Sequence, residues 1–334
     1  MKIQWTHKYS DIISLENLLL AWEEFFLGKK TKPDVQYFSR TLMDNILSLH
    51  EDLVNGNYRH GGYKSFHITV PKPRHIHKAS VRDRLLHHSI YRLLYPFFDH
   101  TFIADSFSCR RGKGTHKAGL RFRQLAGQVS KNNTKTCWVL KCDIKKFFAS
   151  IDHTILLRIL NEHIPDKNIT NLFANIISSF ETMPGQRVGL PLGNLTSQLL
   201  ANVYMNKFDQ WVKHRLKVKQ YVRYADDFVF FSPDKNYLEC TILQVQGFLQ
   251  TNLKLSLHPD KVFIKTFASG IDFLGWVHFP GHRVLRTVTK KRMFAKIKNH
   301  PTEQTLQSYL GLMSHGDAFK LCQEVRSRQW LWQD

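Results

Sequence analysis

Apolar residues recur along the chain at two spacings, which predict helices and strands. A spacing of three to four residues, as at Leu15, Leu18 and Trp22, is typical of the buried face of a helix. This spacing predicts two helices within residues 11–54, interrupted at Gly28–Pro33, and further helices at Ser80–Phe98, Lys117–Val129, Ile155–His163, Ile169–Ser179, Thr196–Lys213, Leu238–Thr251 and from Val288 onward with a break at Asn299–Pro301.

Runs of aromatic and β-branched residues predict the strands. These runs are Tyr63–Val70, Trp138–Cys142, Tyr221–Tyr224, Phe228–Phe231 and short segments around Phe263, Phe267 and Phe273–Trp276. No internal repeat and no unstructured linker interrupts the series. The pattern predicts one continuous, multi-lobed α+β protein, whose 334 residues are enough for one large domain or two to three smaller ones.

Acidic residues stand where apolar strands end. Asp143 follows the strand that ends at Cys142, and Asp226 and Asp227 lie at the turn between two strands. Neighbouring carboxylates repel one another, and a carboxylate at a buried strand end is costly unless it is paired or bound to metal. Mg²⁺ would remove that cost, and two such ions could stabilise both oxygens of a phosphoryl transfer. The alternative is an exposed Asp-Asp turn.

The charge of the chain indicates what such a site would act on. Lys and Arg number 48 against 27 Asp and Glu, which gives a net charge of +21 spread along the whole sequence. This excess indicates a polyanionic partner and favours a charged channel on a folded body. The glycine-containing basic stretch Ser106–Lys117 opens a helix and suits phosphate contact. A solvated basic loop is the alternative reading of that stretch.

Other features argue against further classes of protein. No run reaches the ~18 apolar residues of a membrane span, and the N-terminus has no signal-peptide core. The five cysteines form no CxxC pair, so neither a disulfide framework nor a zinc site is expected, and a reducing cytoplasm fits. The histidine pairs at 75/77 and 87/88 are expected to be phosphate contacts or exposed polar residues rather than metal ligands.

Six motifs, in order over roughly residues 40–320, resemble those of reverse transcriptases. Tyr224-Ala-Asp-Asp227 resembles the YxDD box, and Asp143-Ile-Lys-Lys-Phe-Phe148 resembles the first catalytic motif. The others resemble motifs of the bacterial, group II intron-like branch. Val70–Arg74 with Asp83-Arg84 resembles the fingers motifs, and Ser106–Lys117 resembles the Ser-aromatic-x-x-Arg stretch. His258–Lys261 resembles the later palm motif, and Phe273–Trp276 resembles the primer grip.

This resemblance implies an RNA-directed DNA polymerase with the right-hand fold, an antiparallel-sheet palm and a helical thumb. It would bind an RNA template, a DNA or RNA primer and dNTPs. The implied regions are an N-terminal helical extension of the fingers at 1–60, fingers at 61–135, palm at 136–279 with fingers residues interleaved near 155–195, and thumb at 280–334.

The resemblance also implies roles for individual residues. Asp143, Asp226 and Asp227 would hold two Mg²⁺ ions, for which Mn²⁺ can substitute, with the carbonyl of Ile144 as a further ligand. Lys261 would protonate the pyrophosphate leaving group, or else be an ordinary surface lysine. Nucleotide contacts would be Lys72, Arg74, Phe148, Leu192, Gly193 and Gln198, and template or primer contacts would be Arg110, Arg111, Lys113, Gly275 and Trp276.

For some of these residues, the chemistry of the side chain explains the implied role. Phe148 would be the steric gate that stacks where a ribose 2′-hydroxyl would sit, while its neighbour Phe147 suits core packing better. Lys72 and Arg74 would grip the triphosphate, since Arg binds phosphate in a planar fork, although either could contact the template instead. Asp152 is expected to cap a helix or form an ion pair rather than bind metal.

One motif departs from the common pattern of this branch. Most members carry Gln-Gly-x-x-x-Ser-Pro where this chain has Leu192-Gly-Asn-Leu-Thr-Ser-Gln198. That variant, and the compact size, resemble bacterial or phage-encoded reverse transcriptases of diversity-generating retroelements. The resemblance implies that a template-repeat RNA is copied into cDNA with frequent errors at adenines and that the cDNA replaces a variable repeat in a target gene. It also implies a small, basic, oligomeric accessory variability protein as partner.

Three alternatives stay open at this point. The first is a reverse transcriptase of another bacterial lineage, such as a group II intron relative, a retron or a phage-defence enzyme, which the stretch Leu192–Gln198 disfavours. The second is a nucleic-acid-binding protein on an inactive polymerase fold, which the three intact aspartates oppose. The third is an RNA-dependent RNA polymerase, which Phe148 opposes if it is the steric gate.

Overall fold

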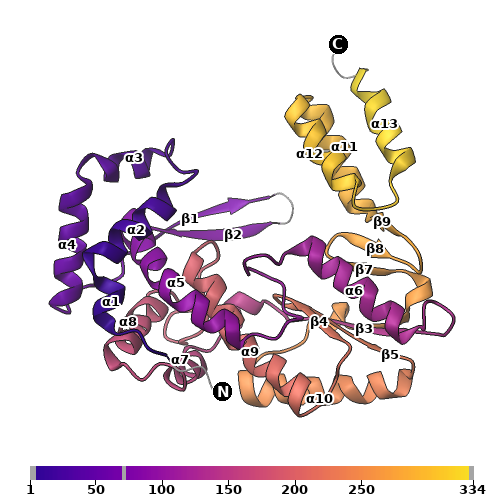
Figure 1. The fold of residues 1–334 in the computed structure, drawn as a ribbon, viewed down its shortest axis with the longest axis horizontal. Coiled ribbons are helices and arrows are strands. Elements are labelled where there is room, and N and C mark those ends of the chain that lie inside the picture. The colour runs from indigo at the N-terminus through magenta and orange to yellow at the C-terminus, as the bar shows by residue number, and fades with distance from the viewer. Residues whose placement is uncertain (1–4, 70–72, 331–334) are drawn as a thin grey trace. The chain divides into compact units, whose positions relative to one another are not determined.

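The computed structural model describes residues 5–69 and 73–330, which form two compact units (Figure 1). Each unit is assembled from separate stretches of the chain. The first contains Met1–Ala104, Ile144–Lys217 and Val245–Leu257, and the second contains Asp105–Asp143, Val218–Gln244 and His258–Asp334. The three expected metal-binding aspartates therefore belong to the second unit, and the expected nucleotide contacts to the first.

The first unit is mainly helical, as the three-to-four spacing of apolar residues predicts. Its helices are α1 (Tyr9–Ile13), α2 (Leu15–Phe26), α3 (Pro33–Arg40), α4 (Leu42–Val54), α5 (Val81–Thr101), α7 (His153–Asn161), α8 (Lys167–Ser178) and α9 (Leu195–His214). Helix α5 packs against both α2 and α9. The buried amide of Asn17 on α2 donates a 2.7 Å hydrogen bond to the hydroxyl of Ser89 on α5. A polar contact that is satisfied in this way fixes how the two helices pair.

The N-terminal region contains more helices than the apolar spacing predicts. The break expected at Gly28–Pro33 is confirmed, but the segment after it forms two helices instead of one. Thr41 separates them because its backbone, at φ −123° and ψ 48°, is not helical. The side-chain amide of Asn45 donates to the carbonyl of Phe38 at 2.9 Å and so satisfies one carbonyl at the end of α3.

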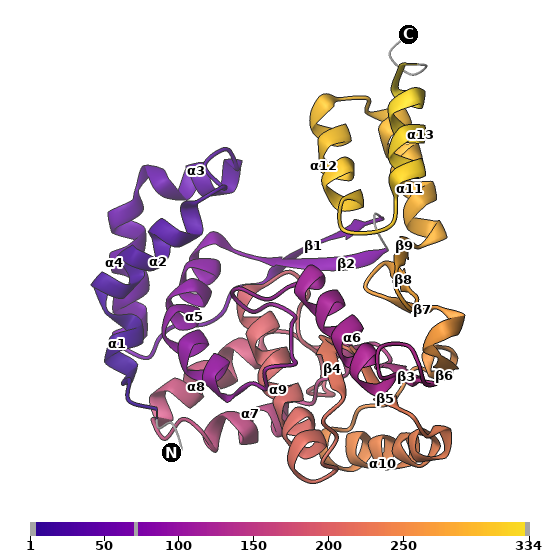
Figure 2. The same ribbon diagram turned by 45° about the vertical axis from the view of Figure 1, so that its right-hand side comes forward.

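Strands β1 (Tyr63–Ile68) and β2 (Arg74–Ala79) form an antiparallel hairpin that extends as an arm from the helices of the first unit (Figure 2). β2 was not predicted, because a stretch with two prolines followed by His, Lys and Arg has little strand character. The outer edge of β2 pairs with the loop before α9. The His77 amide donates to the Leu192 carbonyl at 2.9 Å, and the Asn194 side chain donates to the His77 carbonyl at 2.8 Å.

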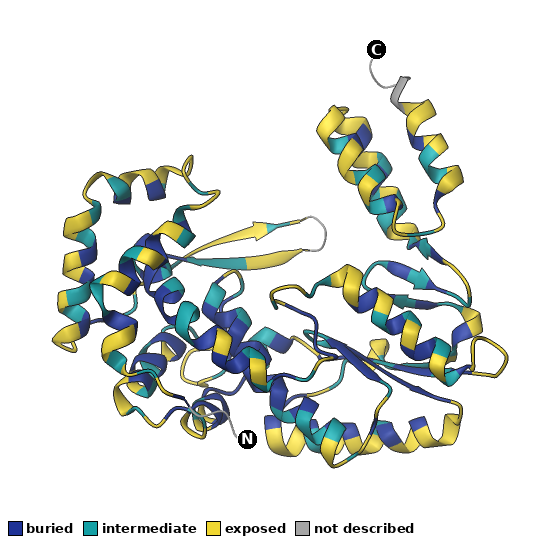
Figure 3. Cartoon of the chain, viewed as in Figure 1, coloured by how far each residue is buried: buried dark blue, intermediate teal, exposed yellow. Residues whose placement is uncertain are grey.

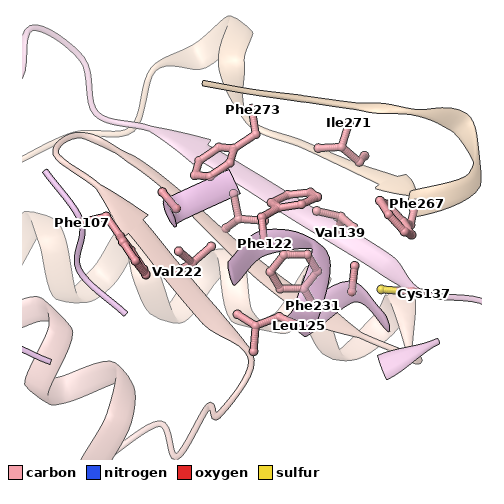
Figure 4. Packing of buried hydrophobic residues seen from close by; sticks show 13 residues of the cluster. Phe107, Phe122, Leu125, Cys137, Val139, Val222, Phe231, Phe267, Ile271 and Phe273 are labelled. Carbon is pink, nitrogen blue, oxygen red and sulfur yellow. The ribbon is translucent and has the colours of Figure 1, made fainter. Parts of the chain in front are cut away.

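The second unit is built around an antiparallel sheet with the strand order β4-β5-β3-β6. Its strands are β4 (Tyr221–Tyr224), β5 (Asp227–Ser232), β3 (Trp138–Asp143) and β6 (Phe263–Thr266). Most residues of β3 and β5 are buried (Figure 3). One face is covered by α6 (Thr115–Val129), whose Phe122 lies among Val139, Phe231 and Phe273 (Figure 4). Helix α10 (Lys235–Leu253) follows β5 in the chain.

A second, three-stranded sheet and three helices complete this unit. The strands are β7 (Ile271–Phe273), β8 (Trp276–His278) and β9 (Arg283–Leu285), and the helices are α11 (Thr287–Asn299), α12 (Glu303–Met313) and α13 (Phe319–Trp330). The helices pack on one another, and Trp276 joins their apolar core. The expected break at Asn299–Pro301 is confirmed, whereas β9 was not predicted. No helix in the described part of the chain is long and apolar enough to cross a membrane.

His87 was expected to be a phosphate contact or an exposed polar residue, but it is buried next to His60, and this burial makes the stability depend on pH. Burial, and next the neighbouring His60, lower the pKa of His87 to about 3, so His87 is neutral in the folded protein at pH 5. The unfolded chain binds a proton below pH ~6.5. Stability is therefore lost as the pH falls from 6.5 toward 3. Replacing His87 by Gln should reduce the loss between pH 6.5 and 5 by about 2 kcal/mol, measured by urea unfolding, whereas the exposed His300→Gln should not.

Candidate active site

Two of the three candidate aspartates are paired across adjacent strands. Asp143, the last residue of β3, is the Cα partner of Asp227, the first residue of β5. Asp227 also pairs with Tyr224 of β4, so Ala225 and Asp226 form the connection between β4 and β5. Asp227 was expected at the turn but is a strand residue. The strand register thus brings together two carboxylates 84 positions apart, with the third at the adjacent turn.

The turn itself is held in an unfavourable backbone conformation. Ala225 has φ 56°, which a residue with a Cβ atom adopts at a cost of about 1 kcal/mol. The carbonyl of Ala225 accepts a 3.0 Å hydrogen bond from the guanidinium of Arg223, which also donates to the hydroxyl of Ser106 at 3.0 Å. The Arg223 side chain is fully buried. It fixes the turn that carries Asp226, a role that no local sequence signal indicated.

Two lysines neutralise part of the negative charge. The ammonium of Lys141 lies 3.1 Å from Oδ1 of Asp227, and that of Lys261 lies 3.0 Å from Oδ1 of Asp143. Lys261 is close to Asp143 because the His258 amide, just before the short helix η2 (Pro259–Lys261), donates to the Asp143 carbonyl at 2.7 Å. Lys261 was predicted from sequence to lie at the site. Lys141 was missed, because a lysine within an apolar strand has no motif to identify it.

Asp226 bears the electrostatic cost of this arrangement. Burial, then the charge of Asp227 and to a smaller extent that of Asp143, raise the pKa of Asp226 to about 6. A carboxyl whose charged form is disfavoured in this way would gain from a bound cation. The free-energy cost of bringing the carboxylates together thus falls mainly on the ionisation of Asp226, in the turn between β4 and β5.

The donor set fits a hard divalent cation. Three carboxylates supply the oxygen ligands that Mg²⁺ prefers, and their mutual repulsion would be relieved by such a cation. Within residues 5–69 and 73–330, however, no group of three or more His, Cys, Asp or Glu side chains is already placed to hold a metal ion. Binding would therefore require these carboxylates to reorient. The contacts with Lys141 and Lys261 are the ones that such a movement would change.

Several of the expected nucleotide contacts of the first unit lie in two segments, the short helix that carries Phe148 and the loop that carries Leu192. Phe147 of η1 (Phe147–Ser150) is buried and Phe148 is half-buried, and the Phe148 carbonyl accepts from the Leu190 amide at 2.7 Å. Leu192, next but one in that loop, is also half-buried. Ile144 follows Asp143 in the chain and is buried. The loop carrying Leu192 is thus tied to the backbone of Phe148.

Gly193 and Gln198 have identifiable structural roles. Gly193 has φ 107°, and a Cβ there would approach Cγ2 of Ile76 on β2 to 2.8 Å, so only glycine fits. Gln198, in the first turn of α9, is half-buried, and its backbone N–H donates to the backbone carbonyl of Asn194. Arg74 is exposed at the start of β2. Lys72 lies outside the described residues.

The expected template and primer contacts lie in two loops of the second unit. Arg111 is exposed, Arg110 donates to the carbonyl of Ser106 at 2.9 Å, and the ammonium of Lys113 lies over the ring of Phe107. Gly275, with φ 86°, is in the two-residue turn between β7 and β8. The ring of Trp276 is buried, so backbone at this turn, rather than the indole, is what a primer could contact.

Asp152 behaves as expected from its distance to Asp143. Its carboxylate accepts from the amide of Ile155 at 2.9 Å and caps α7. It also pairs with Lys254 at 2.6 Å. These bonds hold the pKa of Asp152 below its usual value against the opposing effect of burial. Asp152 is thus confirmed as a helix cap and ion-pair partner.

Comparisons with known proteins match these features. The family model described as "Reverse transcriptase (RNA-dependent DNA polymerase)" matches residues 66–278. Protein YkfC of Escherichia coli is 24% identical over 318 residues, with 81% of each chain covered. The group II intron-encoded protein LtrA of Lactococcus lactis is 22% identical, covering 80% of this chain and 54% of LtrA.

A solved structure supports the fold. Telomerase from Candida albicans, in complex with a fragment of telomeric RNA, superposes with a TM-score of 0.52 at 13% identity, covering 75% of this chain and 50% of that one. At this identity the likeness concerns the fold alone. It agrees with the mixture of helices and antiparallel sheets described above.

Proposed function

Because the chain belongs to the reverse transcriptase (RNA-dependent DNA polymerase) family, we propose that Asp143, Asp226 and Asp227 form the site at which it adds dNTPs to a primer on an RNA template. The enzyme is an RNA-directed DNA polymerase with the right-hand fold. The observation that carries the site assignment is the strand pairing of Asp143 with Asp227 beside the half-buried Asp226, whose pKa the neighbouring carboxylates help to raise.

In the proposed reaction, metal ions, carboxylates and one lysine have separate roles. Two bound divalent cations, Mg²⁺ or alternatively Mn²⁺, would supply charge neutralisation for the attacking and leaving oxygens. Asp143 and Asp226 would bind both ions, Asp227 would be a weaker ligand, and the Ile144 carbonyl would be a further one. Lys261, already at Asp143, would donate a proton to the pyrophosphate leaving group.

Other residues would position the substrates. Phe148 would exclude ribonucleotides, and Arg74 with Lys72 would bind the triphosphate. The remaining contacts proposed are Gly193 and Gln198 for the nucleotide, and Arg110, Arg111, Lys113 and the turn at Gly275–Trp276 for template and primer. We assign 1–60 as an extension of the fingers, 61–135 as fingers, 136–279 as palm with fingers residues near 155–195, and 280–334 as thumb.

The more specific proposal is that the enzyme belongs to a diversity-generating retroelement. The variant motif Leu192–Gln198 supports it. In that role the enzyme would copy a template-repeat RNA into adenine-mutagenised cDNA, together with a basic oligomeric accessory protein. The second candidate is a reverse transcriptase of another bacterial lineage, which the similarity to the group II intron-encoded protein LtrA favours.

Primer extension on RNA distinguishes these proposals. The protein is incubated with a primed RNA template, dNTPs and Mg²⁺, with and without a candidate accessory protein, and the products are sequenced. Incorporation with errors concentrated opposite template adenines is the result expected for the retroelement enzyme. Accurate copying would instead favour another bacterial lineage. A protein that binds the template but extends no primer under either condition would contradict the polymerase site.

Leu192 should lower fidelity because it cannot hydrogen-bond near the nascent base pair. An apolar side chain leaves no buried polar group unpaired when the base pair is misaligned, so the penalty on a wrong pair is reduced. We expect Leu192→Gln to decrease misincorporation opposite adenine by about 3- to 10-fold, the equivalent of one hydrogen bond. Sequenced products of the two enzymes provide the measurement. Leu192→Met, which stays apolar, should keep the original error spectrum.

A further inference from the structure

Lys141 occupies an unusual position for a charged residue. It lies on β3 two residues before Asp143, so both side chains point to the same face of the sheet. Its Cα partner on β5 is Val229, and Asp227 is the diagonal neighbour on that face. Val139 and Val229 of this face belong to the apolar cluster under α6. A lysine here removes charge from water at the edge of a hydrophobic core, which is costly unless the charge is compensated.

The compensation comes from Asp227. The Lys141 side chain is only 14% exposed, and its ammonium contacts Asp227 Oδ1 at 3.1 Å. The other lysine of the site differs, because Lys261 is 47% exposed and its pair with Asp143 is open to water. A shielded pair is screened much less than an exposed one. The pair of Lys141 with Asp227 is therefore the less screened of the two ion pairs.

We propose that Lys141 is a positioning residue that holds Asp227 while no metal is bound and competes with the divalent cation for that carboxylate. The inference rests on the proposed function, since it takes Asp227 as a ligand. Lys141 then sets how much free metal the enzyme needs. It also prevents the three carboxylates from being left uncompensated between catalytic cycles.

The proposal predicts that removing the charge of Lys141 tightens metal binding. Lys141→Met keeps the apolar stem but removes both the competitor and the repulsion of the cation. Direct titration with Mn²⁺, followed by the electron paramagnetic resonance signal of the free ion, should give a dissociation constant lower by about 10-fold, since one unit charge near the site contributes an energy of this order. Lys141→Arg, which keeps the charge, should bind Mn²⁺ within about twofold of the wild type.

A matched control separates this effect from a change in net charge. Lys265 of β6 lies on the same sheet, is exposed, and has its ammonium over the ring of Phe263 rather than at an aspartate. Lys265→Met should leave the Mn²⁺ affinity unchanged. Thermal unfolding in a chelator provides a second readout, in which Lys141→Met should be less stable than wild type and regain stability when Mn²⁺ is added. Lys141→Gln should behave like Lys141→Met if the methionine variant fails to fold.

The outcomes also separate this inference from the proposed function. If wild type and Asp226→Asn bind Mn²⁺ equally, the aspartates are not the metal site and the proposed function fails. If Asp226→Asn loses binding while Lys141→Met and Lys265→Met both match wild type, the site stands and the counter-charge role of Lys141 is overturned.

Discussion

Replacing Asp226 by asparagine is expected to lower the rate of dNTP incorporation by more than about 10³-fold, because a lost metal ligand should cost at least as much as one lost transition-state donor. Single-turnover primer extension on an RNA template at saturating Mg²⁺ measures this rate. Asp260→Asn is the matched control, since its carboxylate is exposed in η2. Incorporation by Asp226→Asn within tenfold of wild type would remove Asp226 from the site.

The same substitution should stabilise the metal-free protein. The pKa of Asp226 is raised to about 6 in the folded chain, from 3.8, so above pH 6 ionisation is harder in the folded than in the unfolded state. Asp226 therefore destabilises the folded protein at neutral pH, by up to about 3 kcal/mol for a shift of this size. The free energy of unfolding of Asp226→Asn should exceed that of the wild type by part of this amount at pH 7.5 and by little at pH 4. A residue kept only for packing would show a loss of stability instead.

Replacing Phe148 by valine is expected to admit ribonucleotides. If the half-buried ring blocks the space of a 2′-hydroxyl, a smaller side chain removes the clash and reduces discrimination against CTP relative to dCTP by about 10²-fold, as for other pockets that select by size. The ratio of kcat/KM for the two nucleotides measures this effect. The fraction of dCTP activity that remains reports separately on any structural damage.

The neighbouring phenylalanine is the control for this experiment. Phe147 is buried in the core, so Phe147→Leu should lower the free energy of unfolding and leave the sugar preference unchanged. If Phe148→Val lowers stability to a similar degree without changing the CTP to dCTP ratio, then Phe148 is a packing residue and the gate lies elsewhere.

The sequence identifies the parts of the site whose signal is local. Asp143, Asp226 and Asp227 stand out because charged residues interrupt apolar strands, and the long amphipathic helices are visible from their spacing. The pairing of Asp143 with Asp227 depends on strand register between distant segments. The contact of Lys141 with Asp227 depends on the same register, and the contact of Arg223 with Ser106 joins another pair of distant segments, so neither role could be predicted from the neighbouring sequence.

Weak or competing local preferences account for the missed elements. β2 begins at Arg74, just after a proline-containing stretch, and its strand character comes from pairing with β1 and with the loop at Leu192. The three-residue strand β9 is too short to give a pattern. Thr41 divides a continuous apolar repeat without a glycine or proline to mark the break. For β2, tertiary contacts outweigh intrinsic propensity.

The hydrogen bonds between β2 and the loop before α9 connect the conformation of the hairpin with the position of Leu192. His77 donates to the Leu192 carbonyl, and Asn194 donates to the His77 carbonyl. Bending of the hairpin would therefore shift the backbone of residue 192 through these hydrogen bonds. Under the role proposed for Leu192, copying accuracy becomes a mechanical property of the hairpin as well as a chemical property of one side chain. Substitutions that stiffen or loosen β1 and β2 would then change the error rate.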